Sequence, residues 1–147
     1  WSEARELDWY MLQDELNAGM LEYMKELLRI YRKYPCMHEI DNDWGGFEWI
    51  NADDAERSTY SFIRKSSDGK NSLLFVLNMT PVARPDYCVG VPRRKNYKLL
   101  LNSDDKRFGG NGAEIPASIR AVSKPSDYRP YRITFDLPAS SAVIFIF

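Results

Sequence analysis

Carboxylate side chains are the groups in this 147-residue sequence that could do chemistry. A glycosidase-type site needs two carboxyl groups held across a cleft. We predict that the acids of the middle and second half lie in turns, where charged side chains are solvated. No catalytic residue is therefore assigned, and a complete small hydrolase is disfavoured. These acids are Asp41, Asp43, Asp53, Asp54, Glu56, Asp104 and Asp105.

Metal sites and activated nucleophiles are disfavoured as well. Asp41–Gly46 resembles the start of a calcium loop, but Gly45 and Ala52 stand at the fifth and twelfth positions, where oxygen ligands are required. One histidine and two distant cysteines fit neither a zinc site nor a histidine-activated nucleophile. We therefore expect no metal, no cofactor and reduced thiols. The three residues are His38, Cys36 and Cys88.

Charge and aromatic content narrow the classes of partner. Twenty basic and twenty-one acidic residues give a net charge of −1, so the chain lacks the basic field that attracts nucleic acid. The apolar runs are too short to cross a bilayer, and no signal peptide opens the sequence, so we expect a cytoplasmic protein. Aromatic residues make up 14%. They could pack in the core or stack on sugars, and they include Trp1, Trp9, Trp44, Trp49, Tyr87 and Phe108.

The first third of the chain has the apolar spacing of an amphipathic helix. Leu16, Met20, Tyr23, Met24, Leu27, Leu28 and Tyr31 form one predicted stripe. Asn17 is the predicted N-cap, and Pro35 ends the helix. We expect the stripe to pack on the remainder of the chain or on a neighbouring copy.

After Pro35 the pattern changes to short aromatic and β-branched runs separated by Gly, Pro and Asp. Eight strands without intervening helices predict an antiparallel β-sandwich. Residues 73–77 are apolar throughout and are expected at a sheet centre, and the apolar run 143–147 is expected to be tucked between strands. The predicted strands are Phe47–Ile50, Thr59–Arg64, Leu73–Met79, Tyr87–Val91, Tyr97–Asn102, Ser118–Ser123, Tyr131–Leu137 and Ala142–Phe147.

A series of short segments resembles one enzyme family in both order and spacing. The segments are Trp1–Glu3, Leu7–Leu12, Leu28–Arg32, Gly46–Ile50, Asp53–Asp54, Ser61–Arg64, Asn78–Val82, Tyr87–Pro92, Leu101–Asp104 and Phe108–Gly110. Together they are similar to the C-terminal part of 1,4-α-glucan branching enzymes of the α-amylase superfamily. The similarity covers about residues 1–112 and is weaker over 137–147.

The resemblance implies a division of the chain and a function. Residues 1–36 would be the terminal segment and last helix of a (β/α)8 catalytic barrel, and 37–147 a C-terminal all-β sandwich. The parent enzyme would move an α-1,4-glucan segment to a C6 hydroxyl in glycogen biosynthesis, with its catalytic acids on earlier barrel strands. Asp8 and Trp9 would line the glucan cleft, although Trp9 could instead pack between barrel and sandwich. A stand-alone carbohydrate-binding module is the alternative.

Overall fold

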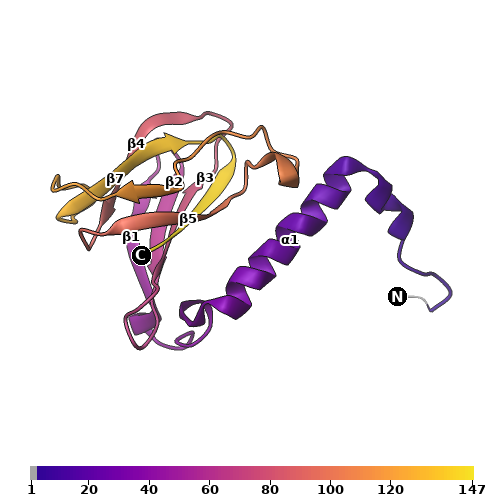
Figure 1. Cartoon of the computed structure of the whole chain (residues 1–147), viewed down its shortest axis with the longest axis horizontal. Helices are drawn as coiled ribbons and strands as arrows, with labels where there is room; N and C mark the ends of the chain where they lie inside the picture. The colour runs from indigo at the N-terminus through magenta and orange to yellow at the C-terminus, as the bar shows by residue number, and fades with distance from the viewer. Residues whose placement is uncertain (1–2) are drawn as a thin grey trace.

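A computed structural model describes residues 3–147 and places one long helix beside a β-sandwich (Figure 1). Trp1 and Ser2, which belong to the first segment of family resemblance, lie outside the described residues. The helix is α1 (Glu15–Lys33), and the short 3-10 turns are η1 (Trp9–Gln13), η2 (Pro35–Met37), η3 (Trp44–Gly46) and η4 (Lys106–Phe108). The strands are β1 (Phe47–Asp54), β2 (Thr59–Arg64), β3 (Leu73–Asn78), β4 (Arg84–Val91), β5 (Asn96–Asn102), β6 (Ser118–Arg120), β7 (Tyr131–Leu137) and β8 (Ser141–Ile146).

The eight strands form two antiparallel sheets, as the sequence predicts. The larger sheet has the order β1-β2-β3-β8-β5-β6, and the smaller sheet pairs β4 with β7. The apolar strand β3 lies inside the larger sheet, and β8 pairs with β3 on one side and β5 on the other. Both predictions for these apolar runs are therefore confirmed, because neither run has a free edge.

Strand β1 runs on to Asp54 and β4 begins at Arg84, so both are longer than predicted, whereas β6 is shorter and ends at Arg120 rather than Ser123. The chain changes partners there. The Ala121 amide donates a hydrogen bond to the Lys95 carbonyl next to β5, whereas Val122 forms an isolated bridge with Arg132 of β7. A segment that links the two sheets cannot continue the ladder with one of them.

The main core lies between the two sheets. Leu74, Val76 and Phe145 of the larger sheet have no exposed surface, and they belong to one buried cluster with Val89 and Leu137 of the smaller sheet. Burying each such side chain contributes about 1.5–3 kcal/mol. The smaller sheet of β4 and β7 therefore covers the centre of the inner face of the larger sheet.

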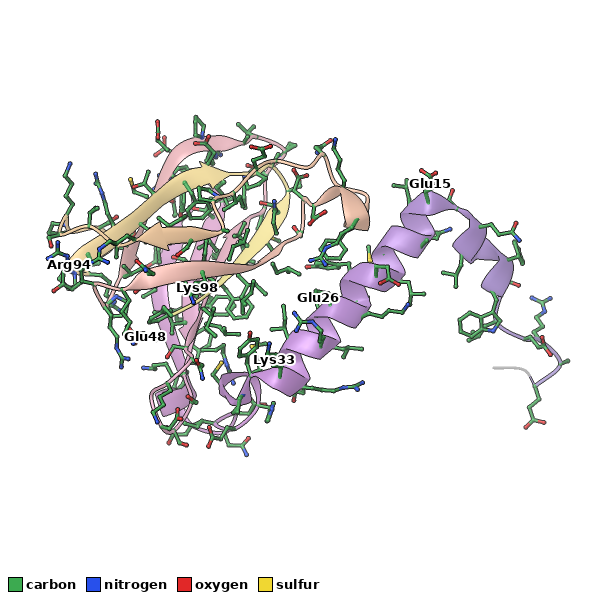
Figure 2. The ribbon with its side chains drawn as sticks, viewed as in Figure 1. Glu15, Glu26, Lys33, Glu48, Arg94 and Lys98 are labelled. Atoms are coloured by element: carbon green, nitrogen blue, oxygen red, sulfur yellow. The ribbon has the colours of Figure 1, made fainter. Side chains whose placement is uncertain are left out.

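Helix α1 packs on the outer face of the same sheet. Ile30 and Tyr34, at its C-terminal end, form a second buried cluster with Leu73, Leu101 and Ile144. Figure 2 shows Lys33 at the end of α1 nearest the sandwich and Glu15 at the far end. The sheet is thus apolar on both faces, and α1 covers part of the outer one.

The helix begins earlier than predicted. Asp14, not Asn17, is the N-cap, and its carboxylate accepts hydrogen bonds from the Leu16 and Asn17 amides at 3.0 and 3.1 Å. The predicted cap, Asn17, lies inside the helix and donates its side-chain amide to the Met11 carbonyl at 3.1 Å. Asp and Asn are similarly good N-cap residues. Because Asp14 precedes Asn17 in the sequence, capping by Asp14 starts the helix three residues earlier.

Candidate functional site

The two residues predicted to line a glucan cleft, Asp8 and Trp9, belong to the segment that precedes α1. Figure 1 shows this segment at the end of α1 farther from the two sheets. Asp8 precedes η1, and its side chain makes no capping hydrogen bond. Trp9 begins η1 with 64% of its surface exposed. Within residues 3–147, therefore, neither side chain is built into a pocket.

Five apolar side chains on α1 remain exposed instead of joining the core. Leu16, Met20, Met24, Leu28 and Tyr31, here called the outer stripe, are 44–67% exposed. The side of α1 that meets the sheet carries Tyr23, Leu27 and Ile30 instead. Tyr23 and Leu27 of the predicted stripe therefore pack on the sandwich as expected, whereas the outer stripe is not buried there, and its packing on a neighbouring copy stays a prediction. The helix has two apolar sides, and the sheet can cover only one of them.

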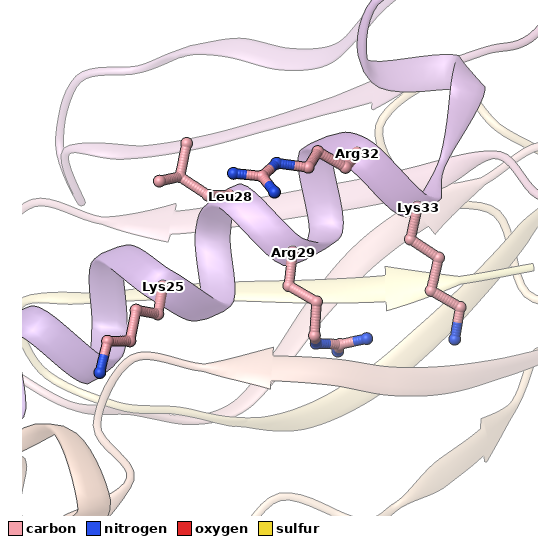
Figure 3. A pocket seen from close by; sticks show the side chains of 5 residues that line it. All are labelled: Lys25, Leu28, Arg29, Arg32 and Lys33. Atoms are coloured by element: carbon pink, nitrogen blue, oxygen red, sulfur yellow. The ribbon is translucent and has the colours of Figure 1, made fainter.

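A basic hollow of about 480 Å³ borders the outer stripe (Figure 3). Lys25, Arg29 and Lys33 leave α1 on one side of it, and Leu28 and Arg32 on the other. Two of the cations have partners on the same helix. Lys25 lies 2.6 Å from Glu22, and Arg29 makes two hydrogen bonds to Glu26. The hydrogen bonds from Arg29 lower the pKa of Glu26, so this pair stays charged.

Aromatic rings cover the part of the outer sheet face that α1 leaves open. Phe62 stacks on Phe75 at 4.7 Å and on Phe47 at 5.2 Å, and the Trp49 ring meets Phe62 edge-on at 5.7 Å. We call these four residues the aromatic face. Phe47 and Trp49 lie on the outer face of the edge strand β1, where Trp49 is 48% exposed.

A polar hollow of about 400 Å³ adjoins the aromatic face. The Trp44 ring beside it is 86% exposed. Arg64 is held in place by the carbonyls of Cys36 and Met37, at 3.1 and 3.2 Å, and forms an ion pair with Asp41. An exposed indole beside fixed polar groups can bind a ligand that has both apolar faces and hydroxyl groups. The hollow is lined by Asp41, Asn42, Asp43, Trp44, Phe47 and Arg64.

Two acids that were predicted to be solvated are instead buried supports. Asp54 lies on β1, not in a turn, and its side chain is 8% exposed. Its carboxylate pairs with Arg57 at 2.6 Å and accepts the Thr59 hydroxyl at 3.0 Å. Asp104 is 7% exposed and accepts hydrogen bonds from the Asn111 and Ala113 amides. Both carboxylates serve the fold, and neither faces a second acid across a cleft in the described part of the chain.

No group of three or more His, Cys, Asp or Glu side chains among residues 3–147 could hold a metal ion. Both cysteines are free thiols. Burial raises the pKa of Cys36 to about 11, so this thiol stays protonated and unreactive. No helix in the same range is long and apolar enough to span a membrane.

Comparisons with known proteins give the chain its relatives. Residues 49–147 match the family described as "Alpha amylase, C-terminal all-beta domain". Over all 147 residues the chain is 56% identical to the 1,4-alpha-glucan branching enzyme GlgB of Butyrivibrio fibrisolvens, and over 146 residues it is 39% identical to GlgB of Aromatoleum aromaticum. The chain spans 23% of the length of each of these two relatives.

A solved structure supports the fold. The α-amylase of Halothermothrix orenii superposes with a TM-score of 0.56 and 18% identity, over 99% of this chain and 24% of that one. At this level of identity, the likeness concerns the fold alone.

The environment of Asp54 makes unfolding free energy depend on pH. Burial raises the pKa of Asp54, but hydrogen bonds from Arg57 and Thr59 outweigh it, and the net pKa lies below its ordinary value of 3.8. A lowered native pKa stabilises the fold above the unfolded-state pKa, and this contribution is lost as pH falls through the native pKa. We expect Asp54→Asn to lower the unfolding free energy by about 1–3 kcal/mol at pH 7. The deficit should shrink below pH 3.8.

Urea unfolding of both proteins from pH 7 to pH 2.5 measures this deficit. Asp53→Asn is the matched control, because Asp53 is an exposed neighbour on the same strand and its loss should change stability by less than about 0.5 kcal/mol. A deficit that stayed constant down to the lowest pH would contradict the assigned ion pair.

Proposed function

The chain belongs to the family of α-amylase C-terminal all-β domains, and from this membership we propose that it is the supporting C-terminal domain of a 1,4-α-glucan branching enzyme. The observation that carries the proposal is identity to branching enzymes along the whole chain, which spans about a quarter of their length. The parent protein would transfer an α-1,4-glucan segment to a C6 hydroxyl, forming α-1,6 branches in glycogen in the cytoplasm.

The supporting role follows from where the described acids lie. Retaining transfer needs a nucleophilic carboxylate and an acid about 5–5.5 Å apart. Asp54 and Asp104 are occupied by fold-stabilising hydrogen bonds. The catalytic acids would therefore come from the catalytic part of the same polypeptide, and no cofactor is required.

The outer stripe is the surface through which this domain would brace the catalytic barrel. It presents five adjacent apolar side chains on a helix that the sandwich already holds from the other side. The partner is a segment of the same polypeptide, because the relatives that the chain matches are about four times its length. Asp8 and Trp9, beyond the start of α1, would then reach the edge of the glucan cleft.

A second function is favoured by the exposed ring of Trp44. The ring and the polar hollow beside it could retain glucan on the sandwich itself. This feature would fit a carbohydrate-binding module. The long helix with a second apolar side does not fit a module that acts alone, so glucan retention is the subsidiary proposal.

We expect this 147-residue chain to show no branching activity, and a polypeptide that also carries the upstream catalytic segment to be active. The measurement is the loss of the blue iodine–amylose colour together with the appearance of α-1,6 linkages. Branching by the 147-residue chain alone would contradict the supporting role. Absence of branching by the longer polypeptide would contradict the proposed enzyme.

The outer stripe gives a test of the bracing role. Met24→Glu should change the unfolding free energy of the 147-residue chain by less than about 0.5 kcal/mol, because Met24 is 46% exposed. In the longer polypeptide the same change should cost about 3 kcal/mol or more, since it buries an unpaired carboxylate. Tyr128→Glu, at a fully exposed position on the sandwich, is the control for added charge. Equal effects of Met24→Glu in the two proteins would contradict docking through this stripe.

Glucan retention is tested by Trp44→Ala in a glycogen co-sedimentation assay. Loss of ring stacking should weaken retention by about 1 kcal/mol, or roughly fivefold. Tyr128→Ala removes an equally exposed ring elsewhere on the sandwich and should leave retention unchanged. If both variants bind like the unmodified chain, the polar hollow is not a glucan site.

A further inference from the structure

The loop between β5 and β6 is closed by partly buried hydrogen bonds. The two carboxylate oxygens of Asp104 accept the Asn111 amide at 2.9 Å and the Ala113 amide at 2.9 Å. The side chain of Asn102 closes the same loop, because its amide donates to the Ala113 carbonyl at 2.8 Å. The backbone folds back so tightly that a Cβ at Gly110 would collide with the Asp104 carbonyl. This loop, residues 102–113, is here called the seat.

Helix α1 rests on the seat at a glycine. A Cβ at Gly19 would lie 2.8 Å from the Phe108 carbonyl carbon and 2.9 Å from its oxygen. Both atoms belong to the backbone, so they cannot move aside as a flexible side chain would. Glycine in a helix interior costs about 0.5–1 kcal/mol relative to alanine. Close approach to the seat is the physical reason for glycine at this position.

Further contacts fix the rotation of the helix on the seat. The Tyr23 ring, one turn after Gly19, meets the Phe108 ring edge-on with centroids 5.4 Å apart. Among the elements of the sandwich, η4 makes more close backbone approaches to α1 than any strand does. Figure 1 shows this loop, in orange, reaching from the sandwich toward the N-terminal half of α1.

Two anchors therefore define the helix axis. The seat holds the half around Gly19, and the buried cluster around Ile30 and Tyr34 holds the other half. Two separated anchors on one side of a helix determine both its tilt and its rotation. They thereby determine the direction in which the exposed outer stripe points.

We propose that the seat is a positioning device, and that Gly19 and Asp104 are positioning residues that orient the outer stripe toward the catalytic part of the polypeptide. The expected effect on catalysis rests on the proposed function. The contact between the seat and α1 does not depend on it. Asp104 stabilises the conformation of the loop. Gly19 has no Cβ, so the loop backbone can approach the helix backbone closely. Neither residue touches glucan in this mechanism.

The first test uses the 147-residue chain and hydrogen exchange. Helix propensity alone predicts that Gly19→Ala slows exchange of α1, because alanine favours helix. The seat predicts the opposite sign, with exchange over residues 15–24 at least about tenfold faster while β3 and β8 stay protected. Met20→Ala, an adjacent exposed position, is the control. Slower or unchanged exchange in Gly19→Ala would overturn the proposal.

Asp104→Asn tests the same device without adding an atom to the helix. The amide cannot replace both carboxylate acceptors, so the loop and residues 15–24 should both exchange faster. Asp68→Asn, in an exposed hairpin, is the matched control. A looser loop beside an unchanged helix would overturn the proposal.

If Gly19→Ala also unfolds β3, Phe108→Leu replaces it in the exchange experiment. This variant removes the contact with the Tyr23 ring and introduces no clash.

The second test uses the longer polypeptide well below its melting temperature. Gly19→Ala should lower kcat for branching at least about threefold per folded molecule, whereas a purely stabilising role would lower only the melting temperature. Unchanged kcat in an active parent would overturn the positioning role. An inactive parent would instead refute the proposed function, and the exchange measurements would still decide on the seat.

Discussion

The six-stranded sheet is apolar on both faces, and this demand for cover on two sides determines the rest of the structure. Its inner face is closed by the small sheet of β4 and β7, around Leu74 and Phe145. Its outer face carries Leu73, Phe75 and Ile144, which no strand covers. A β-sandwich ordinarily exposes polar side chains on its outer faces. Here α1 takes the place of that polar surface.

The helix that covers the sheet needs cover itself, because it also has exposed apolar side chains. By covering the sheet with Ile30 and Tyr34, α1 turns Met20, Met24 and Leu28 outward. A helix with apolar side chains on two sides leaves an exposed apolar patch unless a second surface covers it. The proposed bracing role of the domain rests on this two-sided apolar patterning.

Sequence patterns predicted the strands well because each strand carries its own signal. β3 and β8 are continuous apolar runs, and such runs belong at sheet centres whatever their neighbours. The side of α1 that meets the sheet could not be predicted in this way, because Tyr23 and Met24 both fit the helical period. Gly19 did carry a signal, since an isolated glycine within a helix often marks a close approach, but its partner near Phe108 is about ninety residues away. Non-local contacts of this kind leave no local pattern.

The acids were misjudged for a related reason, and their true role bears on function. Asp54 and Asp104 were placed in solvent because turn acids usually lie there. Hydrogen-bond donors instead lower the pKa of Asp54, and Asp104 accepts amide hydrogen bonds that close a loop. A general acid needs the opposite environment, in which burial without compensating donors raises its pKa toward neutrality. In this domain the buried carboxylates are used as hydrogen-bond acceptors that stabilise the local structure. A surface that positions another part of the protein needs such a stable structure.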